Sequence, residues 1–176
     1  MAMAIAWKTI GKLTDQEVLG TDGLSNKAPR KKTRAILINT DGNIAVMCEK
    51  KTACHALPGG GIEPGEDEES ALVREIAEET GCVCDRIEPL GIVYENRYHA
   101  DTTHLSYFFV VHTNTKDATA HLTDEEVALG TTLKWCSPEE ALQLIQSNDS
   151  NTKQRRFLQA RDLMALNAYI HSVQNP

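Results

Sequence analysis

The feature that most constrains the fold is a glycine- and proline-rich loop that leads directly into a strongly acidic segment, within residues 57–83. Residues 67–80 predict a helix, because the acidic residues at its start favour the positive end of the helix dipole. Gly81 follows at the position where a glycine commonly ends a helix. Four side chains form the face that we expect to pack: Leu72, Val73, Ile76 and Thr80. The remaining face carries the charge, and its spacing needs a further explanation.

Short apolar runs on both sides of this helix predict the strands of a sheet. The predicted strands cover residues 33–39, 44–50, 86–98, 104–113 and 132–136. Pro89 is expected to break the third of these strands, and Asp41-Gly42 predicts a hairpin turn between the first two. Residues 54–61 predict a loop.

Two helices are predicted after the last strand. The first begins with a capping box formed by Ser137 and Glu140, with Pro138 at the first helical position. Residues 151–173 predict a final amphipathic helix. Its apolar side holds Phe157, Leu158, Leu163, Leu166 and Ile170. Helices both between and after mixed strands predict an α/β protein, with a mixed β-sheet between helices in an α/β/α sandwich.

Length and composition predict one domain over residues 1–176, in which residues 1–32 form an N-terminal extension with a turn-rich connector at 20–32. The net charge of −7 gives no electrostatic reason to expect a nucleic acid or an anionic membrane as partner. No apolar run approaches the ~20 residues that a membrane-spanning helix needs. The five cysteines lack the spacing of a zinc site, so we expect free thiols and a cytoplasmic protein.

Three carboxylates share one face of the predicted acidic helix, because Glu75, Glu78 and Glu79 stand at i, i+3 and i+4. Like charges at this spacing repel each other by about a few tenths of a kcal/mol per pair. A cation such as Mg²⁺ reverses the sign of the interaction, because it prefers carboxylate oxygens. Backbone carbonyls of the glycine loop can approach the same ion, since no Cβ blocks them.

Two further charged residues frame this cluster. Arg74 directly precedes it, and Glu66 lies eight residues earlier at the mouth of the helix. We hypothesise that Glu66 and Arg74 form an ion pair that ties the loop to the helix and holds the metal-binding face in register. Either residue alone would more often be a solvated surface charge, so the prediction depends on the combination.

The spacing of these residues matches a known signature. It runs Gly60, five residues, Glu66, seven residues, and then Arg74-Glu75-Ile76-Ala77-Glu78-Glu79-Thr80-Gly81-Cys82. This resembles the signature of the Nudix hydrolases, G-x5-E-x7-R-E-U-x-E-E-x-G-U, in which U is a bulky aliphatic residue. All seven fixed positions match, and a chance match is on the order of 10⁻⁸ per window. One position departs from the signature, because Cys82 stands at the last U, where it is expected to pack in the same way.

The resemblance implies a fold, a reaction and a set of roles. The fold is the Nudix-type sandwich, with the box at residues 60–82 forming loop, helix and loop. The reaction is hydrolysis of a nucleoside diphosphate linked to another group (NDP-X) by metal-activated water, with Mg²⁺ or alternatively Mn²⁺. Glu78 and Glu79 become metal ligands, the Gly60 carbonyl a further ligand, and Glu75 a ligand or the base. Glu66 and Arg74 become structural partners within the catalytic site.

Family members often use another acid from a loop just before the last strand. Glu125 and Glu126 occupy that region here, and we expect Glu126 to reach the metal. A solvated loop is the alternative for both residues.

Residues 94–99 follow the box where the family often places substrate contacts. Tyr94 or Tyr98 could stack on a base, and Asn96 or Arg97 could bind its edge or a phosphate. If the segment is a strand, alternation sends Tyr94, Asn96 and Tyr98 to one face. An ordinary structural strand is the alternative.

Two functions from different classes fit this sequence. The first is a pyrophosphohydrolase with a small-molecule nucleotide substrate, which the intact set of carboxylates favours. The second is a Nudix-fold sensor that binds nucleotides without turning them over, since a fold alone does not settle function. The sequence leaves the substrate open between a nucleoside triphosphate, a dinucleoside polyphosphate and a nucleotide sugar. The final helix is expected to serve docking or a homodimer, with three basic residues: Arg155, Arg156 and Arg161.

Overall fold

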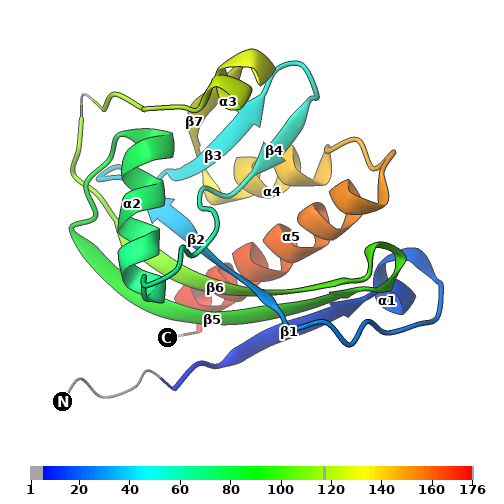
Figure 1. Cartoon of the computed structure of the whole chain (residues 1–176). Coiled ribbons are helices and arrows are strands. Elements are labelled where there is room, and N and C mark those ends of the chain that lie inside the picture. Colours follow the sequence, from blue (N-terminus) through cyan, green and yellow to red (C-terminus); the bar gives the residue numbers. More distant parts are fainter. Residues whose placement is uncertain (1–5, 117, 176) are drawn as a thin grey trace.

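The computed structural model describes residues 6–116 and 118–175, which fold around one mixed β-sheet (Figure 1). The strands are β1 (Thr9–Thr14), β2 (Arg30–Ile38), β3 (Ile44–Glu49), β4 (Cys54–Ala56), β5 (Arg86–Arg97), β6 (Thr102–His112) and β7 (Thr131–Cys136). The helices are α1 (Asp15–Leu19), α2 (Glu68–Thr80), α3 (Asp124–Leu129), α4 (Pro138–Gln146) and α5 (Lys153–Gln174), with a 3₁₀ turn, η1, at Tyr98–Ala100.

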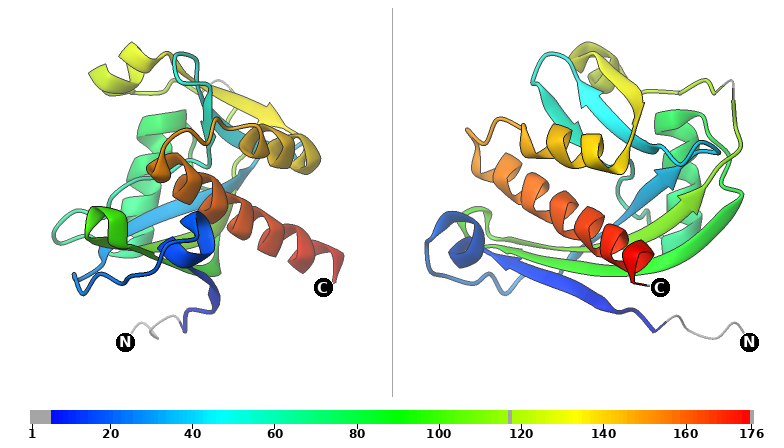
Figure 2. Two further views of the ribbon diagram at one scale, coloured as in Figure 1. Left: turned by 90° about the vertical axis from the view of Figure 1, so that its right-hand side faces the viewer. Right: turned by 180° about the vertical axis from the view of Figure 1, so that it is seen from behind.

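The sheet has the order β1-β5-β6-β2-β3-β4, and β7 pairs with β3 outside this path. The pairs β1–β5 and β2–β6 are parallel, whereas β5–β6, β3–β4 and β3–β7 are antiparallel. Helix α2 covers one face of the sheet, and α4 and α5 cover the other face (Figures 1 and 2). The predicted α/β/α sandwich with a mixed sheet is therefore confirmed.

Alternation along β2 divides the core into two parts. Ile36 and Ile38 face α4 and α5, whereas Ala35 and Leu37 face α2. On α2 itself, Leu72 and Ile76 are fully buried against the sheet. The prediction that Val73 packs was wrong, because this side chain is 42% exposed. Successive helical residues are 100° apart, so a residue next to the buried i, i+4 row turns toward solvent.

The predicted strands and helices are present, with ends shifted by up to three residues. Pro89 does not break β5, because the strand continues through a register irregularity between Pro89 and Gly91. Two regions differ more. The predicted loop at 54–61 begins with β4, and the predicted N-terminal extension contains β1 and α1. The short, mixed sequence of β1 is stabilised by parallel pairing with β5, which no local pattern reveals.

Helix α5 also differs from its predicted surface. Phe157 and Leu166 are fully buried as expected, but so are the neighbouring Arg161, at 1% exposure, and Asp162, at 0%. The prediction that Arg161 belongs to an exposed basic docking face was therefore wrong. The Arg161 Nε donates to the Asp162 carboxylate at 2.8 Å, and this pairing allows both charges to be buried.

One buried histidine on β6 gives a testable pH dependence of stability. Burial, and next the positive charges of Arg97 and Lys32, lower the pKa of His104 to about 4. In the unfolded chain a histidine binds its proton near pH 6.5, so unfolding takes up a proton between pH 6.5 and 4. His104 therefore contributes stability that is fully present above pH 6.5 and is lost as the pH falls toward 4.

We expect this loss to reach about 2–3 kcal/mol in the free energy of unfolding. Urea titrations of wild type and His104→Gln at pH 7.5 and pH 5 measure it directly. The wild type should lose more stability than the variant between these two values. Equal losses in both proteins would show that His104 is not the group responsible.

Candidate functional site

The acidic helix is held at both ends by its own sequence. The Asp67 carboxylate accepts a hydrogen bond from the Ser70 amide at 2.7 Å, which caps the start of α2. Gly81 ends the helix with a φ of 71°, and its amide donates to the Ala77 carbonyl. This glycine has the left-handed conformation that side chains with a Cβ adopt rarely. Helix α2 therefore starts and stops where the sequence pattern predicts.

The loop before α2 runs along β2 like an extra strand. The amides of Thr33 and Ala35 donate to the carbonyls of Gly60 and Pro58, each at 3.0 Å. β3 leaves room for this pairing, because it pairs with β2 only at Ile38 and Ile44 and then diverges (Figure 1). The backbone of the glycine loop is thereby fixed beside the acidic helix.

Arg74 forms several contacts with the charged groups around it. Its guanidinium contacts both oxygens of Glu66, at 2.7 and 2.9 Å, and donates to the Gly61 carbonyl at 3.0 Å. The hydrogen bonds from Arg74, together with the Glu63 amide, lower the pKa of Glu66 to about 2. The hypothesised Glu66–Arg74 ion pair is therefore present, and it ties the loop to the helix.

The same guanidinium also offsets the repulsion within the carboxylate cluster. Nη1 of Arg74 lies 2.8 Å from the Glu75 carboxylate and 3.4 Å from the Glu78 carboxylate. Glu78 is half exposed, whereas the Glu75 side chain is mostly buried. Without a bound cation, the protein thus supplies part of the missing positive charge from its own helix.

Glu79 turns away from Arg74 and into the protein. Its carboxylate accepts the Gly59 amide at 2.6 Å. Burial, reinforced by the nearby carboxylates of Glu75 and Glu126, raises the pKa of Glu79 to about 7, although the positive charge of Arg34 opposes this shift. A bound cation would stabilise the ionised form of such a carboxylate, which burial and the neighbouring carboxylates disfavour.

A cavity of about 160 Å³ opens beside Glu79. Three carboxylates line it from three elements, namely Glu49 on β3, Glu79 on α2 and Glu126 on α3. Arg34 of β2 lines the same cavity as its basic group. Glu126, and not the exposed Glu125, lies at this cavity.

The donor set fits a hard divalent cation, because Glu49 and Glu126 line the same cavity as Glu79 and such an ion prefers carboxylate oxygens. Gly60 belongs to this arrangement, since a Cβ on it would lie 2.4 Å from the Glu75 carboxylate. In the described part of the chain, no three acidic, histidine or cysteine side chains are already gathered as a metal cluster. The reason is visible in the hydrogen bonds, because Arg74 engages Glu75 and Glu78 while Glu79 is bound to the loop.

The motif and this geometry agree with a comparison to known families. The profile of the NUDIX domain matches residues 28–160. The chain belongs to the Nudix hydrolase family. Its Nudix box carries one departure, Cys82 at the last aliphatic position, and this side chain is 2% exposed in the same core cluster as Leu72 and Ile76.

Curated Nudix relatives match part of the chain. Diphosphoinositol polyphosphate phosphohydrolase 3-alpha of Mus musculus is 35% identical over 92 residues, which are 51% of this chain and 51% of that protein. ADP-ribose pyrophosphatase of Methanocaldococcus jannaschii is 46% identical over 59 residues, which are 32% of this chain and 35% of that protein. The chain thus spans about half the length, or less, of these curated relatives.

Solved structures show the same Nudix fold over most of the chain. A NUDIX hydrolase from Nitrosomonas europaea superimposes with a TM-score of 0.60 and 23% identity, covering 82% of this chain and 90% of that one. The E. coli ORF135 protein gives a TM-score of 0.60 and 23% identity, with coverage of 88% and 99%. At these identities the likeness establishes the fold.

The four residues predicted to bind the substrate of this Nudix protein do not all lie on one face of the sheet. Asn96 is buried, and its side chain bonds the Ser25 backbone through both its oxygen and its nitrogen. Tyr94 lies beside Asn96, at 3.4 Å between the hydroxyl and the amide nitrogen. The prediction that Tyr98 shares their strand face was wrong, because β5 ends at Arg97 and Tyr98 lies in η1.

Arg97 has a different environment from its three neighbours. It is buried on the sheet face that α5 covers, with its guanidinium 5.2 Å from the centre of the Phe157 ring. Two residues that line the cavity were not predicted at all, Arg34 and Glu49. Each stands within a predicted strand, and alternation alone does not indicate which polar strand residue will face a ligand.

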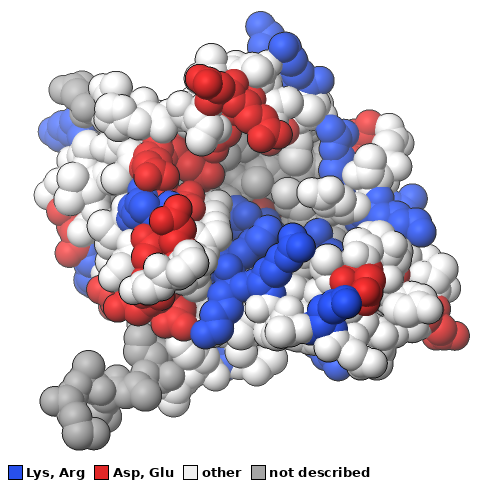
Figure 3. Space-filling view, in the orientation of Figure 1, with Lys and Arg blue, Asp and Glu red and all other residues white. Residues whose placement is uncertain are grey.

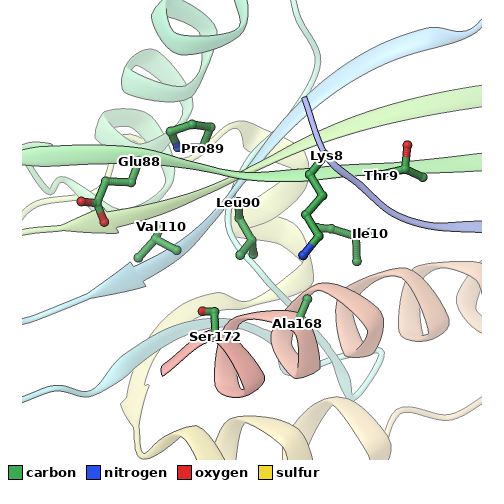
Figure 4. A pocket seen from close by; sticks show the side chains of 9 residues that line it. All are labelled: Lys8, Thr9, Ile10, Glu88, Pro89, Leu90, Val110, Ala168 and Ser172. Atoms are coloured by element: carbon green, nitrogen blue, oxygen red, sulfur yellow. The ribbon is translucent and has the colours of Figure 1, made fainter. Parts of the chain in front are cut away.

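A second cavity, of about 380 Å³, lies between β1, β5 and the end of α5 (Figure 4). Its charged lining residues are Lys8 and Glu88, and none of its lining residues belongs to the Nudix box. The cavity beside Glu79 is therefore the candidate site, although it is the smaller of the two. No helix among residues 6–116 and 118–175 is long and apolar enough to cross a membrane.

Proposed function

We propose that this protein is a metal-dependent pyrophosphohydrolase that cleaves a nucleoside diphosphate linked to another group. The observation that carries the proposal is the partly buried Glu79, which lines one cavity with Arg34 and Glu126 and lies near other carboxylates. A protein selected only for stability would gain by removing such a group. The family relation adds the class of bond, because the curated relatives named above are a phosphohydrolase and a pyrophosphatase.

The proposal assigns a role to each residue of the box. Glu78, Glu79, Glu126 and the Gly60 carbonyl would hold Mg²⁺ or Mn²⁺, with Glu75 as a further ligand or as the base. When bound, such an ion neutralises phosphate charge and lowers the pKa of water. Arg74 and Glu66 hold the loop and the helix in register through their ion pair. Arg34, which lines the cavity, would contact a phosphate of the substrate.

The proton of the attacking water needs a carboxylate within reach. Glu75 is our first choice for this base, because Arg74 holds its carboxylate in place at the edge of the site. Glu126, which lines the cavity, is the second choice. The pair of substitutions Glu75→Gln and Glu126→Gln distinguishes them, because loss of the base lowers kcat more than it weakens metal binding.

The experiment is a panel of nucleoside triphosphates, dinucleoside polyphosphates and nucleotide sugars, assayed with Mg²⁺ for phosphate and pyrophosphate release. We expect one class to be turned over, with loss of activity in EDTA and in Glu78→Gln. Glu69→Gln is the matched control, because Glu69 is an exposed residue at the start of the same helix. Nucleotide binding without turnover of any compound would contradict the proposal and favour the sensor.

A further inference from the structure

A second charged cluster lies on the sheet face opposite α2. It consists of four basic side chains, Lys32 and Arg34 of β2, Arg97 of β5 and Arg161 of α5. They lie on one face of the sheet, because alternation along β2 puts Lys32 and Arg34 on the side that α5 covers, and the Arg97 guanidinium lies 5.2 Å from the centre of the Phe157 ring of that helix. We call these four residues the basic cluster.

Only two carboxylates are paired with the basic cluster among the described residues. Glu95 accepts from Arg97 at 2.6 Å, and Asp162 accepts from Arg161 at 2.8 Å. Arg34 donates to two carbonyls, those of Leu57 and Gly59. Within the described chain, neither Lys32 nor Arg34 has a carboxylate within ion-pair distance. The cluster therefore carries excess positive charge.

This excess charge is partly buried, which makes it costly. Burial, and then the charges of Arg34, Arg161 and Arg97, lower the pKa of Lys32 to about 8. In the described structure, Nε of Arg34 and Nη2 of Arg161 are buried donors without a hydrogen-bond partner. A buried donor of a charged group that lacks a partner costs free energy, and a bound anion removes that cost.

The cluster also contains an unused acceptor. Oε2 of the fully buried Glu95 has no partner in the described structure, and neither has the hydroxyl of Ser106, which stands opposite Lys32 on β6. A ligand with anionic oxygens and at least one hydroxyl or amine donor would satisfy both kinds of atoms. A purely structural cluster would be expected to satisfy them internally.

The basic cluster adjoins the candidate active site through Arg34, which lines the cavity with Glu79 and Glu126. Figure 3 shows a stripe of basic side chains on the surface beside a hollow, with acidic side chains on the other side of the hollow. A substrate held at the acidic face through its diphosphate would extend toward this stripe.

We propose that the basic cluster is an anion subsite, which binds a phosphate group of the substrate beyond the diphosphate held at α2. The preferred substrates are then polyphosphates or compounds whose second group is itself phosphorylated. Nucleotides linked to an uncharged sugar are disfavoured. The inference rests on the proposed function only for the order of the groups along the substrate, because anion binding itself requires no hydrolysis.

Inorganic triphosphate tests the subsite without turnover. Binding is measured by calorimetry in EDTA, so that the acidic face holds no metal. Lys32→Gln is the test variant, because Lys32 is only partly buried and its loss should not prevent folding. Lys31→Gln is the matched control, because it removes the same charge from the next residue, whose exposed side chain alternates to the other face.

We expect Lys32→Gln to weaken triphosphate binding at least about tenfold, and Lys31→Gln to change it less than about twofold. Equal effects of the two variants would overturn the subsite, as would the absence of triphosphate binding by the wild type. Failure of the proposed function looks different. In that case the panel shows no hydrolysis, yet Lys32→Gln still selectively loses triphosphate binding.

Discussion

Glu79→Gln is expected to reduce turnover about 1,000-fold. Loss of one group that stabilises transition-state charge commonly has an effect of this size. Glu79 should matter more than Glu78, because it lines the cavity and is partly buried, while Glu78 is half exposed. Charges in a low-dielectric environment interact more strongly than those screened by water. The measurement is kcat and KM on the substrate class that the panel identifies, with Mg²⁺ in excess.

The same substitution should stabilise the metal-free protein. The Glu79 carboxyl has its pKa raised to about 7 in the folded state, against an ordinary value of 4.5. Unfolding therefore releases this proton between pH 4.5 and 7, so stability falls as the pH rises through this window. Above pH 7 ionised Glu79 destabilises the folded protein by on the order of 2 kcal/mol. A glutamine at this position has no charge and avoids this loss of stability.

Opposite changes in activity and stability distinguish a functional carboxylate from a structural one. Urea unfolding of wild type and Glu79→Gln at pH 8 in EDTA measures the stability half of the prediction. Glu69→Gln again serves as control and should leave both quantities nearly unchanged. A variant that lost activity and stability together would indicate that Glu79 supports the fold through its bond to Gly59.

Gly59→Ala is expected to destabilise the protein by about 3 kcal/mol or more, the range in which backbone strain and overpacking combine. Gly59 has a φ of +134°, and a Cβ there would lie 2.2 Å from the Thr33 carbonyl oxygen and 2.7 Å from the Arg34 Cα. Both contacts are with backbone atoms of β2, which cannot rotate away. The loop would have to leave the strand and take the Glu79 hydrogen bond with it.

Gly42→Ala is the matched control for this prediction. Gly42 also has a positive φ, +78°, but a Cβ there meets nothing within 4 Å. It should therefore show only the cost of the left-handed conformation, about 1 kcal/mol. Thermal unfolding of both variants gives the comparison, and similar losses of stability would mean that the close approach of Gly59 to β2 is not what matters.

The parts of this molecule that could be predicted from sequence are those with local signals. Helix α2 has an acidic start, a regular buried row and a terminal glycine, so its bounds follow to within one residue. The Glu66–Arg74 pair could be hypothesised because both residues belong to one closely spaced motif. Glu125 and Glu126 are neighbours in one segment of the sequence, and the position of Glu126 at the cavity depends on the packing of α3.

The parts that could not be predicted depend on contacts between distant segments. β1 is a strand because β5 lies beside it, some eighty residues along the chain. Arg161 resembles a surface residue of an amphipathic helix, and only the packing of α5 on the sheet buries it together with its neighbour Asp162. The basic cluster draws on β2, β5 and α5, and none of these segments carries a motif for it.

The glycine loop contacts both layers of the sandwich within three residues. The Leu57 amide donates to Asp162 of α5 at 3.0 Å, and the Gly59 amide donates to Glu79 of α2 at 2.6 Å. The loop is therefore hydrogen-bonded to both helices, and neither helix can shift independently of the other without breaking one of these bonds. Although the C-terminal helix lies outside the Nudix box, it helps to set the position of the Glu79 carboxylate. A substrate that displaced α5 would therefore also displace the acidic helix, because residues 57–59 connect the two.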